Sequence, residues 1–150
     1  MNNITNFLQI GDKIYTAGQP TADQFIQLKT LSIKTVINLA LPTTEDAIKN
    51  EAEIVTLMGM TYIQIPVDFQ DPKICELERF YKAMGMSLNE PAFIHCMLNM
   101  RVSVFIYLYR INILKESAEN AWKDVLKIWE PDEIWTLFIR ENTIGNRHNG

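Results

Sequence analysis

Cysteine is scarce in this 150-residue chain, and its placement excludes several classes of protein. The two cysteines, Cys75 and Cys96, lie far apart in the sequence and form no Cys-x-x-Cys pair. A disulfide-stapled fold or a cysteine-rich zinc site needs cysteines in closely spaced sets, so neither is expected. Two free thiols are typical of a reducing compartment, and we therefore expect a cytoplasmic location.

Basic runs and long apolar segments are also missing. The chain has 14 Lys and Arg against 18 Asp and Glu, a net charge of -4, so binding to nucleic acid or to an anionic membrane is not expected. The apolar stretch at 102–109 is too short to span a bilayer, and the N-terminus shows no secretory signal. No group of Cys, His and acidic residues has metal-ligand spacing, so we expect no metal and no cofactor.

The elements that are present predict an α/β fold. Hydrophobic residues make up 47% of the chain, which is enough for a substantial core, and the length suits a single domain over 1–150. Strands are predicted at 14–17, 35–40, 61–67 and 92–94. Helices are predicted at about 21–31, 42–58, 73–87, 102–114, 116–129 and 131–139. The alternation predicts a central, mostly parallel sheet flanked by helices, with three helices at the C-terminal end.

The segment from 91 to 109 carries the strongest chemical signal. A short apolar strand leads to His95 and Cys96, then to a four-residue turn, Arg101 and an apolar stretch typical of a buried helix. A turn that enters a helix points its backbone N–H groups inward, and the helix dipole adds positive potential that attracts an oxyanion. These groups favour the thiolate of Cys96, while the fork of Arg101 can bind two phosphate oxygens. The predicted phosphate-binding residues are Met97, Leu98, Asn99, Met100 and Arg101.

A structural interpretation of the same residues stays open. In that interpretation Cys96 is an ordinary buried thiol and Arg101 is a surface charge at the start of a helix. An arginine is unfavourable there, because the helix dipole attracts anions to the N-terminus and cations to the other end. A structural role therefore explains Arg101 poorly.

With these residues the sequence resembles the cysteine-dependent phosphatases. The likeness is closest to the bacterial putative-phosphatase domain, which is related to beta-lactamase-hydrolase-like proteins and to dual-specificity phosphatases. Besides His95-Cys96 and Arg101, it includes segments 15–21, 35–39 and 65–68, in the family's order over roughly residues 10 to 140. The resemblance implies a dual-specificity (protein tyrosine) phosphatase fold. It also implies hydrolysis of a phosphomonoester, in a protein or a small molecule, through a phosphocysteine intermediate.

The resemblance also implies catalytic roles. Cys96 would be the nucleophile and Arg101 would bind the equatorial phosphoryl oxygens. An aspartate in the loop before the motif would protonate the leaving oxygen and then activate water. Asp68 is the first choice because it follows the predicted strand directly, and Asp71 is the second. Either could instead be a solvated loop acid or a cap of the next helix.

Two further residues have supporting roles in this interpretation. His95 resembles the histidine that braces the cysteine turn through hydrogen bonds without transferring protons. Ser103 places a hydroxyl near the thiolate, but the family usually has Ser or Thr directly after the arginine, where this chain has Val102. Ser103 could instead satisfy only a backbone carbonyl of its helix.

The loop departs from the usual Cys-x5-Arg pattern, because it has one residue fewer and no glycine. Asn99 is expected to replace the glycine, since asparagine tolerates a left-handed backbone. The short ring also resembles the loop of rhodanese-like sulfurtransferases, and the apolar Met97 and Leu98 suit a catalytically weak phosphate-binding module. Segments 18–20 and 66–68 favour the phosphatase over these two alternatives.

Overall fold

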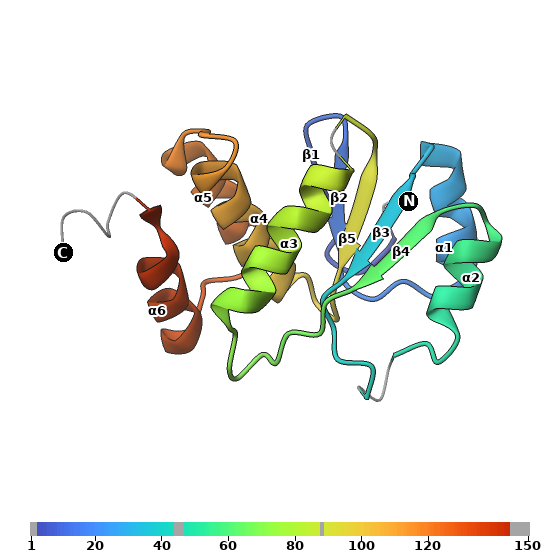
Figure 1. The fold of residues 1–150 in the computed structure, drawn as a ribbon, viewed down its shortest axis with the longest axis horizontal. Helices are drawn as coiled ribbons and strands as arrows, with labels where there is room; N and C mark the ends of the chain where they lie inside the picture. The colour runs from blue at the N-terminus through green and yellow to red at the C-terminus, as the bar shows by residue number, and fades with distance from the viewer. Residues whose placement is uncertain (1–2, 44–46, 88, 145–150) are drawn as a thin grey trace.

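The computed structural model describes residues 3–43, 47–87 and 89–144, which contain one five-stranded sheet in the order β1-β2-β5-β3-β4 (Figure 1). The strands are β1 (Leu8–Ile10), β2 (Ile14–Ala17), β3 (Thr35–Asn38), β4 (Thr61–Gln64) and β5 (Ala92–His95). The four strands β2, β5, β3 and β4 run parallel, and β1 pairs antiparallel with β2. The predicted mostly parallel sheet is confirmed, and β1 is an edge strand that the sequence analysis missed.

Helices cover both faces of the sheet. They are α1 (Ala22–Leu28), continued by the 3-10 turn η1 (Lys29–Leu31), α2 (Glu51–Leu57), α3 (Ile74–Met86), α4 (Met100–Asn112), α5 (Ala118–Leu126) and α6 (Glu133–Asn142). Figure 1 shows α1 and α2 on one side of the sheet and α3 to α6 on the other. Within the described residues, no helix is both long and apolar enough to cross a bilayer.

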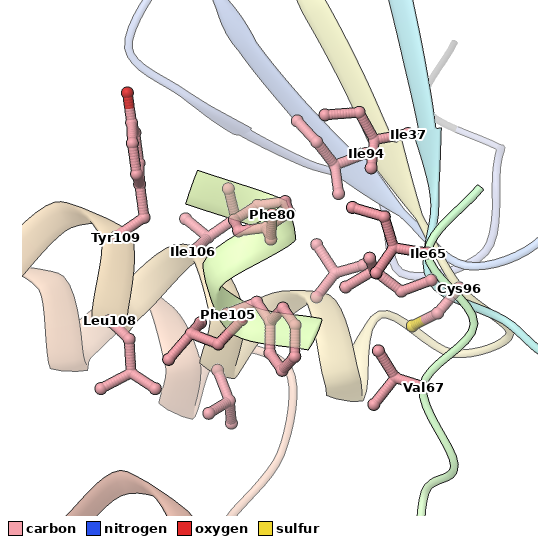
Figure 2. Close-up of a cluster of buried hydrophobic side chains, with 14 of the residues drawn as sticks. Ile37, Ile65, Val67, Phe80, Ile94, Cys96, Phe105, Ile106, Leu108 and Tyr109 are labelled. Atoms are coloured by element: carbon pink, nitrogen blue, oxygen red, sulfur yellow. The ribbon is translucent and has the colours of Figure 1, made fainter. Parts of the chain in front are cut away.

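Alternate strand residues supply two apolar clusters, because successive side chains of a strand point to opposite faces. Val36 and Phe93 pack with the buried residues of α1 and α2. Their neighbours Ile37 and Ile94 pack on the other face with α3, α4 and α6 (Figure 2). The central strand β5 is therefore buried on both faces, which fixes the position of the residues that follow it.

The second helix is shorter than predicted. The sequence indicates a helix from Pro42, but Pro42 and Thr43 form a turn, residues 44–46 lie outside the described residues, and α2 begins only at Glu51. Residues 47–50 are not helical, and the carboxylate of Glu51, the first residue of α2, is bound by the end of β3 and by His95.

At the C-terminus, the residues directly after α6 are anchored to α4. The backbone N–H of Ile144 donates to Asn112 Oδ1 at 3.2 Å. The rest of the chain, 145–150, lies outside the described residues.

Gly18 lets the turn after β2 approach the cysteine loop. Gln19 N donates to the carbonyl of Met97 at 3.0 Å, and Gly18 N donates to the carbonyl of Thr5 at 2.7 Å. A Cβ on residue 18 would lie 2.4 Å from the carbonyl oxygen of Met97. Only glycine allows this approach, because the obstacle is backbone and cannot rotate away.

We expect Gly18→Ala to lower the free energy of unfolding by about 1–3 kcal/mol, the usual cost of overpacking. Gly85→Ala is the matched control, because Gly85 lies in α3 with open space where a Cβ would go. Alanine there should stabilise the protein by about 0.5–1 kcal/mol through helix propensity. Urea unfolding of both variants measures the difference, and equal effects at the two positions would contradict the close approach.

Candidate active site

The loop from Cys96 to Arg101 turns the chain from β5 into α4 through a left-handed residue. Asn99 has φ 68° and ψ 2° and directly precedes the helix. Its side chain is fully buried, and Nδ2 donates to the carbonyl of Asn6 at 2.9 Å and to Thr16 Oγ1 at 3.0 Å. The prediction that Asn99 takes the place of a glycine is confirmed. Its side chain also ties the loop to the N-terminal segment and to β2.

The loop presents unpaired backbone donors. No hydrogen-bond acceptor among the described residues is found for the N–H groups of residues 97–102, and the first bond of α4 runs from Ser103 N to Asn99 O at 2.8 Å. Consecutive unpaired N–H groups at a helix N-terminus bind anions, because the donors converge and the helix dipole is positive there. The geometry suits a tetrahedral oxyanion.

Arg101 is buried beside this loop and is not a surface charge. Only 8% of the residue is exposed. Nη1 donates to the carbonyl of Val67 at 2.9 Å, and this is the guanidinium's one hydrogen bond within the described part of the chain. The remaining donors of the fork are available to an anion. A buried guanidinium at a helix N-terminus has no stabilising partner in the helix dipole, which favours a role in anion binding.

The sulfur of Cys96 is enclosed, although the sequence predicted a thiolate at the edge of an anion site. Cys96 has no exposed surface and belongs to the apolar cluster that includes Ile65 and Val67. Figure 2 shows its sulfur at one end of that cluster. The segment after β4 is itself apolar and packs over the start of the loop. A substrate can therefore reach the sulfur only when these side chains move aside.

His95 connects the loop to α2. Its Nδ1 lies 3.1 Å from the carbonyl of Cys96, and its Nε2 lies 2.7 Å from Glu51 Oε2. The carboxylate of Glu51 also accepts from Gln19 Nε2 at 2.9 Å and from Asn38 Nδ2 at 3.2 Å. All of this lies at the carboxyl end of the parallel strands, where such sheets bind ligands. His95 is held in the position of a brace under the cysteine.

The charge of Glu51 is maintained despite its burial. Burial by itself raises the pKa of Glu51, but the hydrogen bond and charge of His95, with further hydrogen bonds from Gln19 and Tyr62, outweigh it and lower the pKa. Burial raises the pKa of Tyr62, and the negative charge of Glu51 adds to the rise, so this phenol stays neutral. Glu51 is therefore an ionised carboxylate under the site.

The sequence analysis missed Glu51 as a member of the site. The available signal was its place on the helical face that also carries Val55 and Met58, where an acidic residue must be buried and paired. The partners of Glu51 could not be found this way, because Gln19, Asn38 and His95 come from three distant segments.

The two candidate acids differ in their surroundings. Asp68 is exposed and follows Val67, the residue whose carbonyl Arg101 binds, and its Oδ1 accepts from Gln70 N at 2.9 Å. Asp71 pairs with Lys73 beside the start of α3. Asp68 therefore directly follows a residue that is hydrogen-bonded to Arg101 of the loop. Asp71 instead pairs with Lys73, the residue that precedes α3.

The hydroxyl of Ser103 forms hydrogen bonds within α4 and to a tryptophan that follows α5. Its Oγ donates to the carbonyl of Met100 at 2.6 Å and accepts from Trp129 Nε1 at 2.9 Å. These contacts fit the alternative in which Ser103 satisfies a backbone carbonyl. The described residues also contain no group of three or more His, Cys, Asp and Glu side chains that could hold a metal ion.

Solved structures define the class of protein to which this chain belongs. TpbA of P. aeruginosa, in a crystal structure in complex with pTyr, is 16% identical, with a TM-score of 0.72 over 97% of this chain and 91% of that chain. This likeness shows the fold, a protein tyrosine phosphatase-like fold with the helices and mostly parallel sheet described above. The chain therefore has, by class, a protein tyrosine phosphatase-like fold.

The family is set by two crystal structures from Shewanella putrefaciens CN-32, each described as "Putative phosphatase (DUF442)". One is 31% identical, with a TM-score of 0.84 over 96% of this chain and 92% of that chain. The other is 29% identical, with a TM-score of 0.85 over 97% and 95%. The chain belongs to this DUF442 family, which confirms the resemblance inferred from the sequence. No protein-family model and no curated protein matches the chain.

Two substitutions at Asn99 separate its backbone role from its side-chain role. Asn99→Gly keeps the left-handed conformation and removes two hydrogen bonds, so we expect a loss of about 1–2 kcal/mol in the free energy of unfolding. Asn99→Ala removes the same bonds and adds left-handed strain, for a further loss of about 1 kcal/mol. Denaturant unfolding measures both, and an alanine variant as stable as the glycine variant would exclude a backbone constraint.

Proposed function

We propose that this protein is a cysteine-dependent phosphatase that hydrolyses a phosphomonoester through a phosphocysteine intermediate on Cys96. The observation that carries the proposal is the run of unpaired N–H groups at residues 97–102 beside the buried guanidinium of Arg101. Such a loop offers donors to all the nonbridging oxygens of a phosphoryl group. We also infer a single domain over 1–150 that acts in the cytoplasm, because both cysteines are free thiols.

Each reaction step uses a group of this loop or of the neighbouring segment. With the phosphoryl oxygens on the loop N–H groups and Arg101, the thiolate of Cys96 attacks phosphorus. The S–P bond forms as the P–O bond to the leaving group breaks, and Asp68 gives its proton to the leaving oxygen. Asp68 then takes a proton from water, which attacks phosphorus. Inorganic phosphate leaves and the thiolate is restored.

The surroundings of the loop favour a substrate with an apolar leaving group. A hollow beside the loop is lined by polar residues of the β2–α1 turn and by the apolar side chains of Pro20, Ile48, Met97 and Leu98. The loop itself carries no lysine, and its one arginine is Arg101. A single phosphoryl group on an aromatic ring, as in the pTyr bound to TpbA, suits this surface better than a polyphosphorylated ligand.

The complete burial of Cys96 supports one other function. If the packing around the sulfur stays closed, the loop can bind a phosphorylated partner without cleaving it, and the protein acts as a phosphate-binding module. The apolar Met97 and Leu98 agree with this alternative. The two functions differ in turnover and not in anion binding, so they can be separated directly.

We expect the wild-type protein to hydrolyse para-nitrophenyl phosphate and Cys96→Ser to be reduced to the uncatalysed background, because serine is not ionised at neutral pH. Cys75→Ser is the matched control, since Cys75 is exposed and outside the loop, and it should keep full activity. Hydrolysis that survives Cys96→Ser would refute the mechanism. Phosphate binding without turnover would support the binding module, and sulfur transfer from thiosulfate to cyanide would support the sulfurtransferase.

Asp68→Asn should slow the hydrolysis of an alkyl phosphate by about 10²-fold or more, the usual contribution of a general acid. The loss on para-nitrophenyl phosphate should be much smaller, because nitrophenolate leaves without protonation. Asp71→Asn removes the same charge three residues away and should leave both rates unchanged. Steady-state kcat, measured on both substrates, tests whether Asp68 is the general acid. An equal loss on both substrates would exclude that role.

A further inference from the structure

His95 lies between two hydrogen-bond acceptors. Its Nδ1 is 3.1 Å from the carbonyl oxygen of Cys96, and its Nε2 is 2.7 Å from Glu51 Oε2. A carbonyl oxygen only accepts, so Nδ1 must carry a proton. An ionised carboxylate also only accepts, so Nε2 must carry a proton too unless Glu51 itself is protonated. The protonation of His95 therefore depends on the state of Glu51.

The other contacts of Glu51 favour the ionised state. Its Oε1 accepts from Gln19 Nε2 at 2.9 Å, and its Oε2 accepts from Asn38 Nδ2 at 3.2 Å as well as facing His95. The orientation of the Asn38 amide is fixed, because its Oδ1 accepts from Ala40 N at 2.9 Å. Both carboxylate oxygens thus face donors, and a proton on either would oppose one of them. The lowered pKa of Glu51 agrees with this geometry.

The surroundings of the ring leave Glu51 as its charged partner. Phe25 of α1 and Phe93 of β5 flank the imidazole, with ring centroids 5.7 Å and 5.8 Å away. Tyr62 of β4 reaches the same network through the amide of Asn38 at 3.0 Å and stays neutral. Among the described residues, the titratable side chain that is hydrogen-bonded to His95 is therefore that of Glu51, and Tyr62 joins the network only through Asn38 and Glu51.

We propose that Glu51 is a positioning residue that acts through His95, holding the imidazole doubly protonated so that its positive end faces the Cys96 loop and favours the thiolate. The pair is neutral overall, but its dipole points toward the loop and lies in a buried site where screening is weak. The proposal rests on the proposed function, in which the Cys96 thiolate is the nucleophile. It extends the site from the loop to α2.

The test is Glu51→Gln, which keeps the shape of the side chain and removes its charge. The glutamine amide can donate to a neutral Nε2, and its oxygen can still accept from Gln19 Nε2. The bond from Asn38 Nδ2 is lost, and His95 loses one proton. Glu53→Gln is the matched control, because it makes the same charge change on an exposed residue of α2. All proteins carry His148→Asn and Cys75→Ser, so that His95 and Cys96 are the one histidine and the one cysteine observed.

Nitrogen-15 NMR of the histidine ring gives the first readout. At pH 7.5, well above the ordinary His titration near 6.5, both ring nitrogens of His95 should be protonated in the wild-type background and in Glu53→Gln. In Glu51→Gln, Nε2 should be unprotonated and Nδ1 protonated. A neutral imidazole in the wild-type background would overturn the proposal.

Thiolate absorbance at 240 nm, taken as the difference from the corresponding Cys96→Ser protein, gives the second readout and needs no access to the buried sulfur. At neutral pH the thiolate fraction of Glu51→Gln should be about fivefold lower than that of Glu53→Gln. Equal thiolate fractions would overturn the proposal, because Glu51 would then act only on the fold. Neither readout uses turnover, so a protein that passes both and hydrolyses no phosphate ester would refute the proposed function alone.

Discussion

The left-handed backbone at Asn99 is the constraint on which the rest of the site depends. With only four residues between Cys96 and Arg101, the chain must leave β5 and enter α4 within one tight turn, and a positive φ at the last residue before the helix makes this possible. The buried amide of Asn99 then fixes the turn to Asn6 and Thr16. A shorter loop without glycine thus still presents its backbone donors in one direction.

The site combines polar and apolar packing in an unusual way. Below the loop, His95 and Glu51 form a buried, fully hydrogen-bonded pair with Gln19 and Asn38, which is stable only because every carboxylate oxygen has donors. On the other face of the sheet, Cys96 lies in apolar packing with no exposed surface. The unpaired N–H groups of the loop are therefore held in place, whereas the sulfur is enclosed by side chains. The balance between these two features separates a catalyst from a binding module.

Much of the fold was predictable because local patterns and tertiary packing agree. The strands at 14–17, 35–38 and 61–64 follow β-branched or alternating patterns, and the capping box at Thr21 marks the start of α1. The prediction failed where tertiary contacts override local preference. Pro42 and the acidic residues after it suggest a helix start, but α2 begins only at Glu51, whose carboxylate is bound by residues of distant segments. The short strand β1 has little pattern of its own and forms by pairing with β2.

The sequence by itself determined the parallel sheet, the cysteine loop between β5 and α4, and the left-handed role of Asn99, because each depends on residues that are neighbours in the chain. Only the tertiary structure decided that Arg101 is buried against Val67, that Cys96 is enclosed, and that Glu51 supports His95. These features join segments far apart in sequence, and their energies come from burial and from hydrogen bonds that exist only after the chain has folded.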